Sequence, residues 1–158
     1  MNNFIELSNL NKIFFAKKNL KVLNKINFKF KLGKIYSLMG PSGSGKSTLL
    51  NLISLIDRPT SGSIKFEKKQ VDFDKKNEND VFRANNIGIV YQQDNLLADF
   101  NALENVYLAA LTTGNKKENA INKSKKILKL VGLSNRLDHY PNELSGGEKQ
   151  RVSIARAL

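Results

Sequence analysis

The pattern of apolar and polar positions in the first third of the chain predicts strands joined by turns. Residues 4–7 can open a sheet, and residues 25–31 (Lys-Ile-Asn-Phe-Lys-Phe-Lys) alternate polar and apolar positions without a break. An alternation of period two is typical of a strand with one buried face, so we predict an antiparallel strand over 25–31. Residues 35–39 and 87–91 are short and mostly apolar, which predicts two strands that are buried on both faces.

Helical patterns dominate the rest of the chain. Residues 48–56 form a mostly apolar run after a glycine-rich segment, and we predict a helix there. Two further helices are predicted over 102–111 and 117–131, with Gly132 placed to end the second. Residues 67–80 are polar and of mixed charge, which predicts a surface excursion. The order of elements favours an α/β core followed by a mainly helical subdomain.

Composition excludes several classes of protein. The 158 residues are 41% apolar, which is enough for one core. Cysteine is absent, which excludes disulfides and thiolate chemistry, and the single histidine, His139, excludes a multi-histidine metal site. The sequence contains neither an apolar run near the roughly 18 residues of a membrane span nor the layout of a signal peptide. We therefore expect a soluble intracellular chain.

A net charge of +12 raises the question of a nucleic-acid partner. The basic residues are mostly lysines, spread along the chain among many asparagines, as in residues 24–27. That mixture is more typical of a codon bias than of a phosphate track, so we expect no nucleic-acid partner. A basic surface beside anionic lipid headgroups is the other interpretation, with each lysine near the surface adding about 1 kcal/mol.

The first loop with a chemical signature spans residues 40–48 and matches G-x-x-x-x-G-K-[ST]. Its glycines let the main chain wrap closely, so that N–H groups can point at phosphate oxygens. Lys46 can reach the β- and γ-phosphates, and the Ser47 hydroxyl can ligate Mg²⁺. A glycine-rich turn that matches by accident is the alternative, but the apolar segments on either side favour nucleotide binding. The predicted binding residues are Gly40, Pro41, Ser42, Gly43, Ser44, Gly45, Lys46, Ser47 and Thr48.

A second loop spans residues 144–151 (Leu-Ser-Gly-Gly-Glu-Lys-Gln-Arg). Ser145 and Glu148 have the spacing of a capping box, which predicts a helix over 149–158. A capping box does not need Gly146 and Gly147, which cost roughly 1 kcal/mol each against alanine inside a helix. Bare main chain at a helix N-terminus suits the close approach of an anion, so we predict a second loop that faces phosphate.

Together the two loops resemble the Walker A loop and the LSGGQ-type signature of the ATP-binding subunits of ABC transporters. The resemblance follows the family order along the whole chain and implies ATP and Mg²⁺ as cofactors. It places Phe14 where the family stacks an aromatic ring on adenine, although Phe15 is a rival and a core role at a strand end is the alternative. It also implies that Gln92 is the Q-loop glutamine, which contacts Mg²⁺ and the attacking water, with Gln93 as the neighbouring choice.

The resemblance implies a P-loop NTPase fold with an N-terminal antiparallel part and a helical subdomain. Residues 1–91 and 141–158 would form the core, and about 92–140 the helical subdomain. In the family two copies form a homodimer and sandwich each ATP, so Ser145, Gly146 and Gly147 would touch the γ-phosphate bound by the other copy. The helical subdomain would receive a transmembrane permease partner, which implies a peripheral location on the cytoplasmic face of the inner membrane.

Within the family, residues 95–106, residues 131–133 and Pro141 look most like the subunit that powers lipoprotein release from the bacterial inner membrane. Ala98 departs from the proline expected at its position. Subunits that serve macrolide-type export and cell division share much of this pattern, and they remain alternatives. The cargo and the direction of transport do not follow from this sequence.

The resemblance ends before the last third of the family domain. No apolar strand ending in Asp-Glu, as the family's Walker B strand does, occurs in these 158 residues. His139 precedes the signature and cannot stand in for the family's switch histidine. We therefore expect the segment to be incomplete, marginally stable, weak in ATP binding and unable to hydrolyse ATP. A binding module that does not hydrolyse ATP and an ABC-type protein acting on nucleic acid or ribosomes are the alternatives, but the latter usually has paired domains or coiled-coil insertions.

Overall fold

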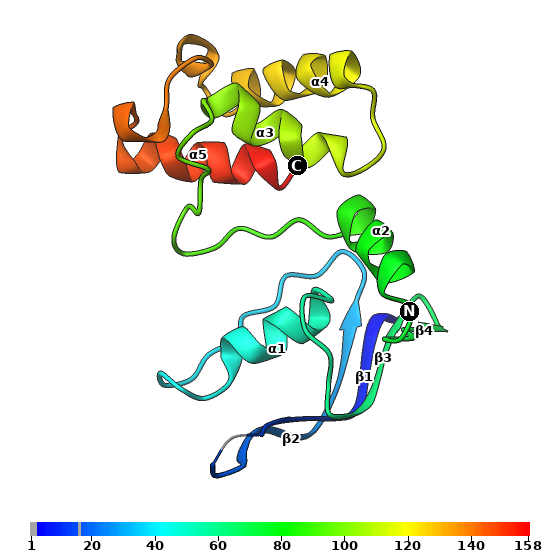
Figure 1. The fold of residues 1–158 in the computed structure, drawn as a ribbon. Coiled ribbons are helices and arrows are strands. Elements are labelled where there is room, and N and C mark those ends of the chain that lie inside the picture. The colour runs from blue at the N-terminus through cyan, green and yellow to red at the C-terminus, as the bar shows by residue number, and fades with distance from the viewer. Residues whose placement is uncertain (1–2, 16) are drawn as a thin grey trace. The chain divides into compact units, whose positions relative to one another are not determined.

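The computed structural model describes residues 3–15 and 17–158, which fall into two compact units (Figure 1). The first unit spans residues 1–80 and contains a β-sheet, the glycine-rich loop of residues 40–45 and one helix. The second unit spans residues 81–158 and is helical. Helix α2 (Lys76–Asn86) crosses the boundary between the units.

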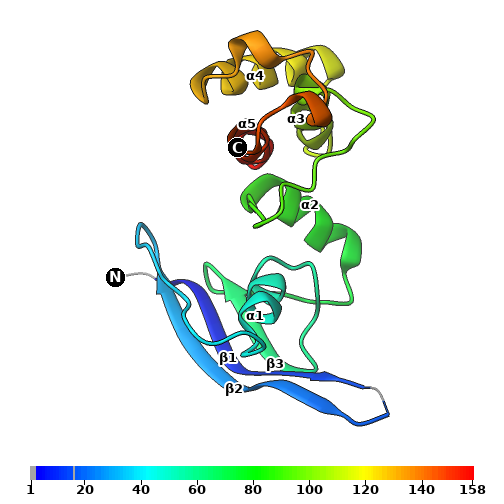
Figure 2. The ribbon, with the colours of Figure 1, turned by 90° about the vertical axis from the view of Figure 1, so that its left-hand side faces the viewer.

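Four strands form one antiparallel sheet in the described residues, in the order β2-β1-β3-β4. Strand β1 therefore pairs on both sides, and Figure 2 shows it with β2 as a long curved ribbon. The strands predicted over 4–7 and 25–31 are confirmed, each as part of a longer strand. The strand bounds are β1 (Asn3–Phe14), β2 (Leu20–Lys31), β3 (Ser61–Phe66) and β4 (Lys69–Gln70).

Helix α1 (Lys46–Ile53) lies against this sheet and follows the glycine-rich loop directly (Figure 2). It begins two residues before the predicted start and ends three residues before the predicted end. Apolar side chains of the helix and the sheet form the core of the unit, since burial of such surface contributes about 25 cal/mol per Å². The buried core residues are Leu7, Leu10, Leu23, Leu52, Leu55, Ile64 and Phe66.

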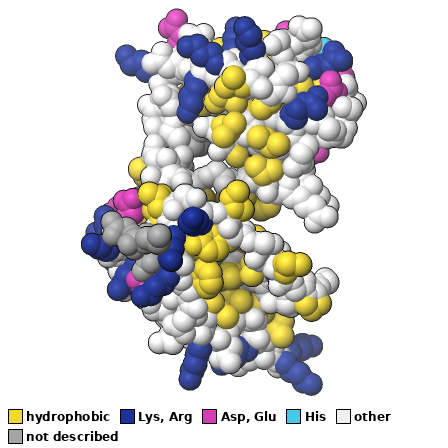
Figure 3. Space-filling model, turned by 180° about the vertical axis from the view of Figure 1, so that it is seen from behind, with side chains coloured by type: hydrophobic (Ala, Val, Ile, Leu, Met, Phe, Trp, Pro, Cys, Tyr) yellow, Lys and Arg dark blue, Asp and Glu magenta, His cyan; other side chains and the backbone are white. Residues whose placement is uncertain are grey.

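The prediction of buried strands over 35–39 and 87–91 is wrong. Neither segment joins a ladder with any other described residue, and Ile35 is 101% exposed, Met39 86% and Val90 44%. A strand buried on both faces needs neighbours that accept and donate its main-chain hydrogen bonds. Among the described residues neither segment has such a neighbour, although β2 and β4 each pair on one side only. Figure 3 shows apolar side chains gathered on the face of each unit that it presents.

One residue of the 35–39 segment is nevertheless held by the sheet. The hydroxyl oxygen of Tyr36 accepts a 2.8 Å hydrogen bond from the Lys31 main-chain N–H. Its ring meets Phe28 and Phe30 edge-on, with centroids 5.7 and 5.0 Å apart. Such edge-to-face pairs are a favoured aromatic geometry, so this cluster fixes the start of the segment against β2.

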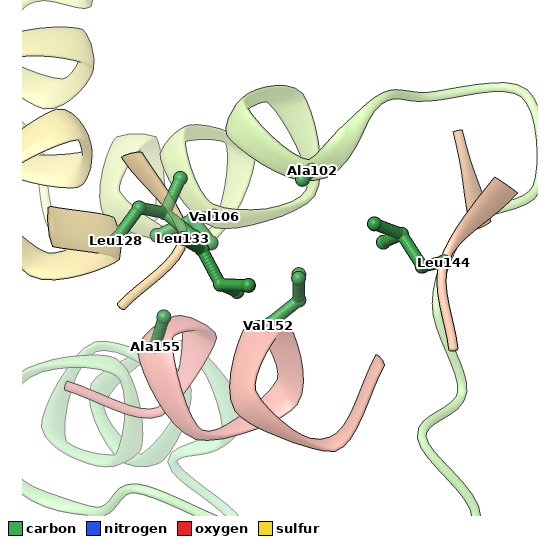
Figure 4. Packing of buried hydrophobic residues seen from close by; sticks show 7 residues of the cluster. All are labelled: Ala102, Val106, Leu128, Leu133, Leu144, Val152 and Ala155. Carbon is green, nitrogen blue, oxygen red and sulfur yellow. The ribbon is translucent and has the colours of Figure 1, made fainter. Parts of the chain in front are cut away.

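The second unit is a set of helices packed around one apolar cluster (Figure 4). Its longer helices are α3 (Ala102–Leu111), α4 (Lys117–Leu130) and α5 (Gly146–Arg156). Short 3₁₀ turns, η1 (Ser134–Arg136) and η2 (Pro141–Glu143), precede α5. The cluster consists of Ala102, Val106, Leu128, Leu133, Leu144, Val152 and Ala155.

The helices predicted over 102–111 and 117–131 are confirmed, and Gly132 ends the second of them as expected. Gly132 has a φ of 74°, and the N–H of Leu133 after it donates to the Leu128 carbonyl at 2.8 Å. That is the pattern of a glycine C-cap. The described residues contain no helix that is long and apolar enough to cross a bilayer. The division into a 1–91 plus 141–158 core and a 92–140 subdomain stays a prediction.

Gly62, at the start of β3, is the glycine with the strictest steric requirement in the sheet. Its φ is 91°, and a Cβ there would lie 2.3 Å from the Asn9 carbonyl oxygen of β1. We expect Gly62→Ala to lower the free energy of unfolding by about 2–4 kcal/mol, through strain and overlap together. Urea denaturation measures this. Gly33→Ala is the control, because Gly33 has a φ of 70° but open space around its Cβ position among the described residues, and about 1 kcal/mol is expected. Equal losses in the two variants would contradict the steric argument.

Candidate functional site

The glycine-rich loop owes its tight course to left-handed main-chain conformations. Gly40, Gly43 and Gly45 have φ values of 154°, 78° and 88°. At Gly45 a Cβ would also approach Val22 Cγ1 to 3.0 Å and Leu23 Cδ2 to 3.1 Å, both on β2. Glycine at this position therefore lets the start of α1 pack directly on the sheet. A helix N-terminus reached through such a loop is suited to anion binding.

The Lys46 ammonium folds back over this loop. Its Nζ donates to the carbonyl oxygens of Gly40 at 2.8 Å and Pro41 at 2.7 Å, and lies 3.5 Å from the Ser44 hydroxyl. The loop is exposed, so a phosphate oxygen can replace these carbonyls as the partner of the ammonium. The Ser47 residue next to it is also exposed, and a hydroxyl oxygen is a donor type that fits Mg²⁺. The residues present therefore fit a nucleotide phosphate with its metal ion.

Phe14 lies in the same unit, at the end of β1 where it pairs with Leu20 of β2. The residue is 43% exposed, which leaves ring surface open for a base, and the neighbouring Phe15 is 74% exposed. Phe14 has a fixed neighbour, because the Lys12 Nζ lies 5.0 Å from its ring centroid. The first unit thus brings together the predicted base-stacking ring and the whole phosphate loop.

Gln92 and the signature residues belong to the second unit. Gln92 and Gln93 are both exposed, in the irregular segment that leads to α3. Ser145 is the N-cap of α5, and Gly146 and Gly147 form its first turn. The structure does not by itself relate these residues to the phosphate loop of the first unit, and their roles stay predictions.

The predicted capping box at α5 is confirmed. Glu148 accepts from the Ser145 main-chain N–H at 2.8 Å, and Ser145 Oγ accepts from the Glu148 N–H at 3.3 Å. Arg136 Nε donates to the other carboxylate oxygen of Glu148 at 2.8 Å. These donors, the Arg136 guanidinium foremost and Ser145 after it, lower the pKa of Glu148 from 4.5 to about 2. The carboxylate is therefore ionised across the physiological range, and it fixes the loop through two hydrogen bonds.

The two signature glycines are not required by the packing of this chain. Neither has a positive φ. Among the described residues, a Cβ at Gly146 would meet open space, and one at Gly147 would come no closer than 3.7 Å, to Arg151 Nη1. Their small size therefore leaves the start of α5 uncovered without any benefit to the fold, as an approaching anion would need.

Sequence reasoning missed the side chains that hold these loops in place. Arg136 reaches Glu148 across 12 positions, and Arg156 donates to the carbonyls of Asp94 and Asn95 at 2.7 Å each. Asn105 is 1% exposed and bonds the main chain of Leu97, Phe100 and Asn101. The segment after Gln92 is thereby tied to α3 and α5. No local pattern signals such long-range contacts; the one signal available in the sequence is a polar residue, Asn105, within a mostly apolar helix.

Comparison with known proteins identifies the family of this chain. The sequence profile of the ABC transporter family matches residues 23–158. The chain is 46% identical to the lipoprotein-releasing system ATP-binding protein LolD of Buchnera aphidicola, over all of this chain and 70% of that protein. It is 43% identical to the uncharacterized ABC transporter ATP-binding protein YknY of Bacillus subtilis, over 98% of this chain and 67% of that one.

Solved structures agree with the sequence comparisons. The dimeric structure of MJ0796, a bacterial ABC transporter cassette, has a TM-score of 0.87 and 38% identity over 98% of this chain and 68% of its own. The same cassette bound to ADP and Pi, in a post-hydrolysis dimer, has a TM-score of 0.85. The fold is that of an incomplete P-loop NTPase domain. This chain belongs to the ABC transporter family, as an ATP-binding cassette similar to LolD.

The Glu148 carboxylate makes the stability of α5 depend on pH. Its folded pKa is lowered to about 2, so its contribution is full above about pH 4.5 and is lost as the pH falls toward 2. We expect Glu148→Gln to be less stable than the native chain at pH 7, and the difference to vanish between pH 4.5 and 2. Thermal unfolding followed across that range measures it, with Glu118→Gln on the exposed start of α4 as the control for lost charge. A difference that persists unchanged at pH 2 would refute the ion-pair explanation.

Because the first turn of α5 is open, a substitution of one of its glycines is predicted to stabilise the chain. We expect Gly147→Ala to raise the free energy of unfolding of the chain by about 0.5–1 kcal/mol, because alanine is the better helix former and meets only ordinary contacts. Gly132→Ala is the matched comparison and should be destabilising, since φ is 74° there. Chemical denaturation of both variants tests this, and destabilisation by Gly147→Ala would show that the glycine serves the fold.

Proposed function

We propose that this chain binds ATP through residues 40–48 and Phe14, as the ATP-binding subunit of a transporter that releases lipoproteins from the bacterial inner membrane. The observation that carries the proposal is the phosphate loop, with three glycines at positive φ and the Lys46 ammonium held over it by exchangeable carbonyls. Membership of the ABC transporter family supports ATP as the nucleotide.

Lys46 and Gln92 are the proposed catalytic residues. Lys46 neutralises negative charge on the β- and γ-phosphates, and Gln92 orients the attacking water. Ser47 and Gln92 would hold Mg²⁺, which supplies further neutralisation of phosphate charge when it is bound. The exposed hydroxyl of Ser47, next to Lys46 at the start of α1, supports this assignment.

The signature residues act on a second copy. Ser145, Gly146 and Gly147 would meet the γ-phosphate bound by the partner in a homodimer. The uncovered first turn of α5 supports this role, because two glycines there serve no contact among the described residues of the chain itself. The similar cassette MJ0796 is dimeric in two solved structures, which supports a homodimer.

The cargo assignment depends on similarity to LolD of Buchnera aphidicola, at 46% identity. It implies transmembrane permease subunits as partners and a peripheral place on the cytoplasmic face of the inner membrane. Macrolide-type export and cell-division complexes remain the alternative assemblies. A module that binds ATP without hydrolysing it is the second candidate function, and it is favoured by the lack of an apolar strand ending in Asp-Glu within these residues.

Lys46→Ala tests the nucleotide site. We expect it to weaken ATP binding at least tenfold, because it removes the cation that faces the phosphates. Ser47→Ala should instead abolish the strengthening of ATP binding by Mg²⁺. Isothermal titration with and without Mg²⁺ measures both, and Lys34→Ala, on an exposed lysine of the same unit, is the charge control. Equal ATP affinity in Lys46→Ala and the native chain would exclude the proposed site.

A phosphate-release assay on the same variants tests the binding-only module. We expect no release from the 158-residue chain above the Lys46→Ala background. Release that Lys46→Ala abolishes would show hydrolysis and would exclude the binding-only module.

A further inference from the structure

The Lys12 side chain has an unusual environment for a lysine on a strand. Only 11% of it is exposed, and its Nζ lies 2.7 Å from both carboxylate oxygens of Asp57. It also donates to the Arg58 carbonyl at 2.9 Å, and it lies 5.0 Å from the centroid of the Phe14 ring. Lysine is rarely buried unless it is paired, and the Asp57 carboxylate is the partner that allows Lys12 to be buried here.

The three N–H donors of the ammonium account for these neighbours. One is directed to the Asp57 carboxylate, one to the Arg58 carbonyl, and the third can face the π-system of Phe14. The ammonium is thus fixed by two strong acceptors and presents its charge to one face of the ring. Phe14 is 43% exposed, so part of its surface is open to a planar base.

The same contacts connect the ring to the phosphate loop. Residues 57–60 follow α1, and Thr60 is hydrogen-bonded to β1 on both sides of Lys12. The Ile13 N–H donates to Thr60 Oγ1 at 2.9 Å, and the Thr60 N–H donates to the Asn11 carbonyl at 2.9 Å. The turn after α1 is therefore bonded to β1 next to Phe14, and α1 itself begins at Lys46, so this turn links the ring to the helix that carries the phosphate-loop lysine.

The geometry points to Lys12 as a positioning residue for the nucleobase, which sets the orientation of Phe14 through the Asp57 ion pair. This inference rests on the proposed function, and in particular on Phe14 as the base-stacking ring. Lys12 does not touch the nucleotide. It decides how much of the affinity of the site comes from the base rather than from the phosphates.

The test compares ATP with inorganic triphosphate, which has the phosphates but no base. In the 158-residue chain we expect Lys12→Met to weaken ATP binding about threefold to tenfold, measured by NMR titration, and to leave triphosphate binding unchanged. Lys12→Met/Asp57→Asn guards against an unpaired carboxylate that could unfold the turn, since asparagine keeps an oxygen for the Arg58 N–H. Lys21→Met, on an exposed residue that pairs with Ile13, removes the same charge nearby and should change neither affinity.

Phe14→Ala makes the outcomes distinguishable. If Lys12 acts through the ring, Lys12→Met has no further effect on ATP binding in the Phe14→Ala background. Equal weakening of ATP and triphosphate by Lys12→Met would make Lys12 merely structural and overturn the inference. Weaker ATP binding in Phe14→Ala but not in Lys12→Met would overturn the inference and leave Phe14 as the stacking ring. No change in Phe14→Ala would refute the proposed role of Phe14, and the inference with it.

Discussion

Both candidate phosphate sites depend on one constraint: main chain at the start of a helix must stay uncovered, so that an anion can approach it. Uncovered main chain at its start makes a helix less stable, and the two units stabilise their helix starts in different ways. At α1 the sheet supports the loop, because Gly45 lets the helix start pack against Val22 and Leu23. At α5 no sheet is available. The first turn is instead held by the capping box of Ser145 and Glu148, and Arg136 donates a further hydrogen bond to Glu148.

Each unit also contains a second element tied to its helix. In the first unit β1 pairs with two strands and carries Phe14 at its end, while the turn after α1 is bonded to the same strand end. In the second unit the segment after Gln92 is bonded by Arg156 at the end of α5 and by the buried Asn105 of α3. The residues proposed to recognise the base and the phosphates thus belong to one unit. Gln92 and the signature loop belong to the other unit.

Local features of this structure could be predicted from the sequence, and long-range ones could not. Both bounds of the helix over residues 102–111 were predicted correctly, because the helical run and its N-cap, Asn101, are neighbours in the sequence. The strand over 35–39 was wrong, because a strand exists only where another strand pairs with it, and an apolar run says nothing about that partner. The ion pair of Lys12 and Asp57 joins residues 45 positions apart and has no local signal. The glycine loops were recognisable because their residue types stand at a fixed local spacing, which needs no knowledge of distant contacts.

The physical chemistry of the site separates nucleotide binding from hydrolysis. Binding needs donors and cations, and the loop of residues 40–45 with Lys46 contains both types of group. Hydrolysis also needs a positioned water, and a general base beside it works best when its pKa lies near the working pH. Glu148 is the carboxylate nearest the signature glycines in sequence, yet Arg136 and Ser145 lower its pKa to about 2, which makes it a poor proton acceptor. Its acidity follows from its structural role, because the hydrogen bonds that hold the loop also stabilise its charge. The Glu148 carboxylate is thus committed to the Ser145 main chain and the Arg136 guanidinium.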